Sequence, residues 1–163
     1  MKELALEIFT YNPTLIILLH VLSGVVWVGG MIAIRFAVHP AMQNIEDGKT
    51  RLARMLELLK NFFNIVTVFI VLLLITALIM SLAIDFAGSN LSYFVHLKEL
   101  IWSVMTIIFM FIVKRRDRAE RAFVSGDMNT AKTLLAPIAK YLIPINIGLG
   151  ILAIAFGIVL RGF

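Results

Sequence analysis

Four long apolar stretches decide what this chain can fold into. A helix needs about 20 mostly apolar residues to cross the hydrocarbon core of a bilayer. Residues 14–38, 62–84, 91–113 and 141–160 meet this length. The whole chain is 61% hydrophobic, well above the apolar share of a soluble domain. The sequence therefore predicts an all-α integral membrane protein, with four transmembrane helices in a single bundle domain that covers residues 1–163.

The connections between these stretches also have helical character. Residues 50–60 place four apolar side chains on one helical face: Leu52, Met55, Leu56 and Leu59. We expect this segment to extend the second span out of the membrane. Residues 114–140 begin with the basic run KRRDRAER and break at Ser125-Gly126-Asp127 before the helix resumes.

Positive charge predicts the orientation. Most of the 15 lysines and arginines lie in the first and third connections: Lys49, Arg51, Arg54, Lys60, Lys114, Arg115, Arg116, Arg118, Arg121, Lys132 and Lys140. Residues 85–90, between the second and third spans, carry none. Because basic loops stay in the cytoplasm, we expect both termini and residues 85–90 on the outer side. The net charge of +5 thus reports topology rather than a nucleic-acid partner, and we expect membrane lipid as the surroundings.

Composition and motifs exclude several chemistries. The chain has no cysteine, which rules out disulfides, thiolate metal sites and cysteine nucleophiles. Its sequence contains no phosphate-binding Walker loop, no nucleophile elbow and no zincin histidine pair.

Two histidines lie at matching depths in parallel spans. His20 is seven residues beyond Pro13, about 10 Å along its helix, and His96 is five residues beyond Leu91, about 8 Å along its own. Two imidazoles at one level can bracket a flat macrocycle or share a metal ion. We therefore predict His20 and His96 as metal ligands, with heme b as the cofactor and copper as the alternative.

The neighbours of these histidines complete the predicted site. Helical steps from His20 lead to Gly24, which allows close approach of a ring or helix, and to Trp27. Steps from His96 lead to Glu99, Ser103 and Thr106, a polar stripe that we expect to face the bundle interior. The predicted cofactor-binding set is His20, His96, Gly24, Trp27, Lys98 and Arg161.

Lys98 and Arg161 have a separate predicted role. Lys98 lies off the polar stripe, near enough to the outer surface to reach it, and Arg161 ends the fourth span on the same side. Together they would receive the two propionates of a heme. Lys98 and Glu99 are also the candidates for a catalytic role.

Other interpretations stay open at the sequence level. A membrane histidine is often an interhelical hydrogen-bonding residue without a cofactor, and the chain is then a structural subunit. The eight methionines are scattered, as expected of core filler rather than a Cu(I) site. His39, Met80 and Met31 are the remaining ligand candidates. Asn64, Thr67 and Thr76 are interpreted as helix-packing polar residues.

Two segments resemble a known group. The stretch LHVLSGVVWVGGMIAIRFAVHPAM resembles the first span of the CopD-like and HemJ-like bacterial membrane proteins, and HLKELIWSVMTIIFMFIVKRRDRAE resembles their third span. The matching positions are His20, Trp27, Gly30, Arg35, Pro40, Lys98 and the basic exit run from Lys114 to Arg118. Pro144 and the closing Arg161-Gly162-Phe163 are similar to the HemJ-type C-terminal end.

The resemblance implies a helical bundle in the bacterial cytoplasmic (inner) membrane that binds b-type heme or is linked to copper. It implies His20 as an axial ligand and Lys98 as a functional lysine. HemJ-type proteins oxidise protoporphyrinogen, but their third-span histidines are replaced here by Phe109-Met110-Phe111, and an Asn-Glu pair by Leu142-Ile143. We therefore expect weak or absent oxidase activity.

The functional expectation is a heme-binding membrane protein that transfers electrons, with quinol or another redox partner, or that handles heme. A HemJ-type oxidase and a CopD-type copper protein are the alternatives, and a homo-oligomer is left open.

The predicted topology can be tested by single-cysteine labelling, because the chain contains no other cysteine. A membrane-impermeant maleimide applied to intact cells should label Ser89→Cys and spare Ser125→Cys, since the basic connections stay inside. Labelling of position 125 alone would reverse the orientation.

Overall fold

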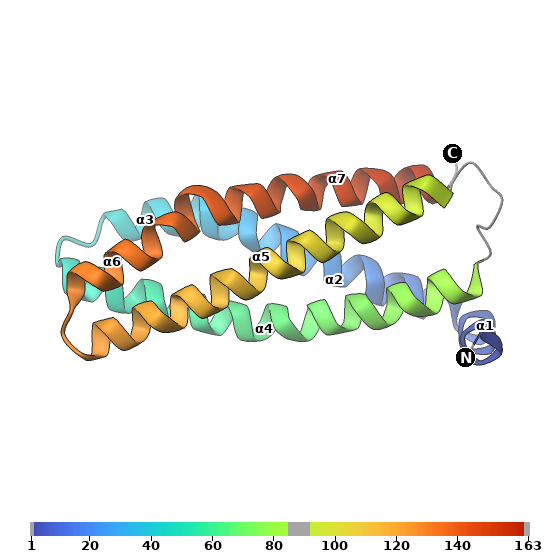
Figure 1. Cartoon of the computed structure of the whole chain (residues 1–163), viewed down its shortest axis with the longest axis horizontal. Helices are drawn as coiled ribbons and strands as arrows, with labels where there is room; N and C mark the ends of the chain where they lie inside the picture. Colours follow the sequence, from blue (N-terminus) through green and yellow to red (C-terminus); the bar gives the residue numbers. More distant parts are fainter. Residues whose placement is uncertain (1, 85–91, 162–163) are drawn as a thin grey trace.

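The computed structural model describes residues 2–84 and 92–161, and this part of the chain is helical nearly throughout (Figure 1). Its elements are α1 (Lys2–Tyr11), α2 (Pro13–Ala33), η1 (Ile34–Val38), α3 (His39–Gln43), α4 (Gly48–Ala83), α5 (Ser92–Val124), α6 (Met128–Pro137), η2 (Ile138–Leu142) and α7 (Ile143–Arg161). The predicted all-α fold class is confirmed.

Four continuous helices in the described ranges are long and apolar enough to cross a membrane: Pro13–Gln43, Gly48–Ala83, Ser92–Val124 and Met128–Leu160. They pack side by side as one elongated bundle, with both chain ends at the same end (Figure 1). We call this the terminal end and the opposite one the basic end. The four predicted spans are confirmed, as a multi-pass membrane protein requires. The predicted start of the third span, at Leu91, lies outside the described residues.

The helices are longer than the hydrocarbon core is thick. α4 has 36 residues, which corresponds to about 54 Å of helix, against about 30 Å of hydrocarbon. As expected, residues 50–60 belong to the same helix as the second span. α5 likewise continues beyond the predicted limit at Val113, as far as Val124. At least part of the bundle therefore projects past the membrane.

The core is built around three aromatic rings from three spans. Trp27 of α2 meets Phe109 of α5 edge-on, with ring centroids 5.9 Å apart, and Phe63 of α4 meets the same Phe109 at 5.5 Å. All three side chains are buried. Many large apolar side chains on the outer faces are exposed instead, among them Leu18, Val68, Ile107 and Phe111. An apolar exterior around a packed core is what a bilayer environment favours.

Turn chemistry defines the connections at the basic end. Asp47 caps α4 by accepting hydrogen bonds from the backbone N–H groups of Lys49 and Thr50, and Asp127 caps α6 through Thr130 N–H. Gly126 adopts the left-handed conformation, at φ 87°, that the α5–α6 turn requires. The predicted break at residues 125–127 is thus confirmed.

The two caps make a pH-dependent contribution to stability. The side-chain hydrogen bond with Thr50 holds the pKa of Asp47 below its usual value, and that with Thr130 does the same for Asp127. Because the pKa is lower in the folded state than in the unfolded chain, this contribution is present above pH 3.8. It is lost as the pH falls through the folded-state value.

Two π-helical turns interrupt the first and last spans. The N–H of His39 donates to the carbonyl of Ile34, and that of Ile143 to Ile138, in each case five residues back. Each turn is followed after one residue by a proline, Pro40 or Pro144. A proline has no N–H and crowds the carbonyl four residues earlier, which a wider turn accommodates. The first span therefore runs past its predicted end at Val38, and the last begins before residue 141.

Helix α1 was not predicted from the sequence. It lies across the terminal end of the bundle and packs against α4 (Figure 1). Leu4, Leu6 and Ile8 are exposed on it, next to charged residues of the same helix, as in helices that lie along a membrane interface.

Gly150 offers a test of the packing between three spans. A Cβ at this position would lie 2.5 Å from Val28 Cγ2 and 3.2 Å from Met105 Cε. Because the branched valine cannot turn aside, Gly150→Ala should destabilise the bundle by about 1–3 kcal/mol. Unfolding in detergent followed by circular dichroism measures the effect. Gly148→Ala is the control, because a Cβ there meets nothing within 4 Å; equal melting of both variants would contradict the packing.

Candidate functional site

His20 is held by a hydrogen bond from one span to another. Its Nδ1 lies 3.0 Å from Oγ1 of Thr76 on α4. The Thr76 hydroxyl donates its single proton to the backbone, 2.8 Å from the carbonyl oxygen of Leu72 and 3.1 Å from that of Leu73. With the hydroxyl proton directed to its own helix, Oγ1 acts as the acceptor and the ring as the donor, which assigns the imidazole proton to Nδ1. In this tautomer Nε2 carries the lone pair.

Lys98 approaches the same histidine from α5. Its side chain is half-buried, close enough to His20 to act on it electrostatically. Nζ rests over Gly157 of α7, where a Cβ would lie only 3.3 Å away. Lys98 has no hydrogen-bond or ion-pair partner within residues 2–84 and 92–161. His20, Thr76, Lys98 and Gly157, one from each span, form what we call the His20 cluster.

His96 and Glu99 lie on the opposite side of α5. Their side chains are 78% and 56% exposed, with His96 Nδ1 3.4 Å from Glu99 Oε2. The expectation that this polar stripe faces the bundle interior is wrong for His96, Glu99 and Ser103, which are exposed, whereas Thr106 is half-buried. That Lys98 reaches the outer membrane surface stays a prediction. Residues two apart on a helix differ by about 200°, so His96 and Lys98 cannot both face inward. A ligand role for His96 stays a prediction.

The remaining predicted residues occupy different surroundings. Gly24 is in ordinary contact with α4, since a Cβ there would lie 3.9 Å from Leu73 Cδ1. Trp27 is 1% exposed, and its indole N–H has no partner among the described residues. Arg161 ends α7, and its side chain lies outside what the structure describes. In the described ranges, no three His, Asp or Glu side chains come together as a metal site.

The three reserve ligand candidates are not together either. Met31 belongs to the buried core, and Met80 is half-buried near the end of α4. His39 lies at the basic end, next to η1. Only His20, of the residues proposed as ligands, is in the His20 cluster.

Two polar residues matter more than the sequence indicated. Thr76 was expected to support helix packing, yet its hydroxyl fixes the tautomer of His20. Asn146 of α7 is fully buried and donates from Nδ2 to the carbonyl of Met105, at 3.3 Å. Its Oδ1 has no partner among the described atoms. In both cases, the sequence signal that could have identified the residue is a polar side chain inside an apolar stretch.

The fold and the cluster define a multi-pass α-helical membrane protein with an oriented histidine inside its bundle, beside a lysine that has no partner among the described residues. Comparison of the chain with protein-family models, curated proteins and solved structures finds no match. The functional argument therefore depends on the residues themselves.

Thr76→Val tests whether the hydroxyl holds His20. The change keeps the shape but leaves the Nδ1–H without an acceptor, so the free energy of unfolding should fall by about 1–2 kcal/mol. Thr76→Ser should restore it. Thr67→Val is the matched control, because the exposed Thr67 bonds only to Phe63 of its own helix and should change stability by under about 0.5 kcal/mol. Equal losses at positions 76 and 67 would show that the bond to His20 contributes nothing.

Proposed function

We propose that this protein binds b-type heme in its membrane bundle, with Nε2 of His20 as an axial iron ligand. The hydrogen bond between His20 and Thr76 carries the proposal. Histidines that ligate metals usually donate their second N–H to a neighbouring acceptor, which fixes the ring and the tautomer. His20 already has this arrangement, with the ligating nitrogen free.

Lys98 supports an anionic ligand beside this histidine. An ionisable group inside a membrane is costly and normally has a partner, yet Lys98 has none among the described residues. A heme propionate would supply the missing negative charge. Gly157, which carries no side chain, leaves the space that Nζ occupies. The donor set of the His20 cluster thus fits one axial bond and one propionate.

Bound heme would supply reversible one-electron chemistry, and the residues of the chain would do the rest. Thr76 would orient the imidazole, and Lys98 would balance a carboxylate. The three apolar neighbours on the bundle axis, Trp27, Phe63 and Phe109, would exclude water beyond the site. This combination suits electron transfer or heme handling.

The second axial ligand separates two arrangements. His96 is exposed on α5, so the bundle as folded offers one imidazole at the His20 cluster. The histidine pair expected from the sequence needs α5 to turn about its axis, or a second copy of the chain. A single imidazole would leave one iron position open, as ligand-binding hemes require.

The absorption spectrum of the detergent-purified protein tests the proposal. We expect a Soret band, and sharp α and β bands on reduction if the iron has two axial ligands. His20→Ala should remove most of the heme, whereas His39→Ala, at the basic end, should keep it. A colourless protein with stoichiometric copper would favour the CopD-type alternative. An unchanged spectrum in His20→Ala would refute the assignment.

His96→Ala decides between the two arrangements. If His96 is a ligand, the variant should change a low-spin spectrum to high-spin or lose heme. If its only contact is Glu99, the spectrum should stay as it is. Complementation of a strain without protoporphyrinogen oxidase separates the remaining alternative, because full rescue would assign the enzyme activity.

A further inference from the structure

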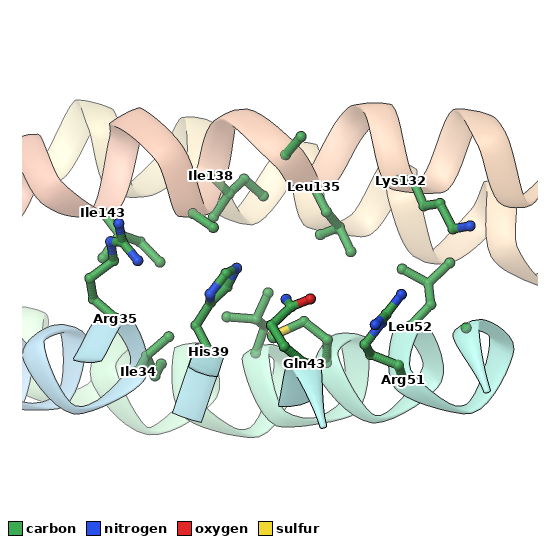
Figure 2. Close-up of a pocket in the computed structure, with 15 residues that line it drawn as sticks. Ile34, Arg35, His39, Gln43, Arg51, Leu52, Lys132, Leu135, Ile138 and Ile143 are labelled. Atoms are coloured by element: carbon green, nitrogen blue, oxygen red, sulfur yellow. The ribbon is translucent and has the colours of Figure 1, made fainter. Parts of the chain in front are cut away.

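A second polar site lies at the basic end, far from the His20 cluster. It is a cavity of about 220 Å³ between the first two spans and the last one (Figure 2). Its polar lining consists of Arg35, His39, Gln43, Arg51 and Lys132. Figure 2 shows the first four projecting from η1, α3 and α4 towards α6 and η2. Leu59, Leu135, Ile138 and Ile143 line its apolar part. We call this cavity the basic pocket.

The cations of the basic pocket have no counter-charge. No aspartate or glutamate is among the described residues that line it. Arg35 and Arg51 are half-buried, and neither has an ion pair or side-chain hydrogen bond within the described ranges. The guanidinium carbon of Arg35 lies 5.8 Å from the ring centroid of its neighbour Phe36.

Three other cations at this end have a carboxylate partner. Arg54 pairs with Glu57 at 3.0 Å, and Lys60 approaches Glu120 at 3.6 Å. The buried Arg116 has two carboxylates, at 2.6 Å from Asp117 and 3.1 Å from Glu120. Half-buried arginines that line one pocket without a carboxylate leave a local excess of positive charge, which an anion would neutralise.

Both π-helical turns border this pocket. η1 and the residue after it supply Ile34, Arg35 and His39, and η2 and the residue after it supply Ile138, Ala139 and Ile143. Each π turn widens its helix and changes the direction in which the following residues point. π-helical turns occur frequently at functional sites, where they re-aim side chains. Here they direct Arg35 and His39 into one space.

The depth of the pocket matches the level of lipid phosphates. Arg35 is 22 residues beyond Pro13, which is about 33 Å along the helix, against about 30 Å for the hydrocarbon core. With Pro13 as one boundary of the hydrocarbon, Arg35 is at the level of the phosphate groups of the opposite leaflet. The apolar lining continues from the cations towards the core, as a ligand with an acyl chain requires. Its volume suits a headgroup rather than a whole lipid.

We propose that the basic pocket binds a phosphate-bearing group, with the guanidinium groups of Arg35 and Arg51 towards its two ends and His39 and Gln43 between them (Figure 2). Lys132 lies across the pocket from Arg51. The planar guanidinium presents paired donors that match phosphate oxygens, which a lysine ammonium does not. Basic pockets between transmembrane helices recognise anionic headgroups in this way. The proposal is independent of heme, since none of its residues belongs to the His20 cluster.

Native mass spectrometry of the delipidated full chain tests this site. The probes are dioleoyl phosphatidylglycerol, dioleoyl phosphatidylcholine and inorganic phosphate. We expect one phosphatidylglycerol to bind more tightly than the neutral-headgroup lipid. Arg35→Gln and Arg51→Gln should each weaken that binding about tenfold, because each removes a hydrogen bond between charged groups.

Control variants distinguish binding in the pocket from general attraction between a basic protein and an anionic lipid. Lys114→Gln with Arg118→Gln removes the same charge from exposed positions outside the pocket and should leave binding unchanged. Arg35→Lys with Arg51→Lys keeps the charge but loses the paired donors, so binding should weaken. Circular dichroism confirms that each variant folds.

The two sources of phosphate give different results. Binding that requires the acyl chains assigns the pocket to a lipid headgroup. Binding of inorganic phosphate with the same dependence on Arg35 and Arg51 assigns it to a soluble phosphate. Either result supports the site. Equal losses in the pocket and control variants, or no selective binding of any probe, would overturn it.

Discussion

Hydrocarbon offers no hydrogen bond to a peptide group, and the rest of this structure depends on that constraint. Every span must satisfy its own N–H and C=O groups, so the chain crosses only as helices. Where Pro40 and Pro144 remove a donor, the backbone does not open. Instead, the N–H of His39 donates to the carbonyl of Ile34 and the N–H of Ile143 to that of Ile138, each five residues earlier in the chain. The irregular turns are thus the way in which these spans stay helical.

The same constraint applies to side chains inside the bundle. The Thr76 hydroxyl donates its proton to a backbone carbonyl of its own helix and accepts a hydrogen bond from His20. One hydroxyl thus provides hydrogen bonds to polar groups of two spans. Lys98 has no such partner among the described residues, and neither has Oδ1 of Asn146. Satisfied groups explain how the fold is stabilised. Unsatisfied groups are where a ligand gains most by binding.

Depth along a helix could be predicted from the sequence, but direction around it could not. Apolar length located the four spans, and turn residues located the break at residues 125–127. His20 was expected to share a site with His96, whereas the α5 side chain near enough to act on it electrostatically is Lys98, about 3 Å further along the helix. The face of α5 was misjudged because polar residues occur on both its sides. Packing against Gly157, which no local pattern encodes, selects the lysine.

The π turn at η2 has a geometric consequence for the other end of the molecule. It adds one residue to a helical turn, and one residue corresponds to about 100° of rotation about the helix axis. All of α7 follows η2, so this single irregularity sets the azimuth of Asn146, Gly150 and Gly157. Gly157 faces Lys98 because of a turn 15 residues, or about 22 Å, away. One continuous helix therefore lines both sites. The π turn beside the basic pocket determines which residue of α7 faces Lys98 beside His20.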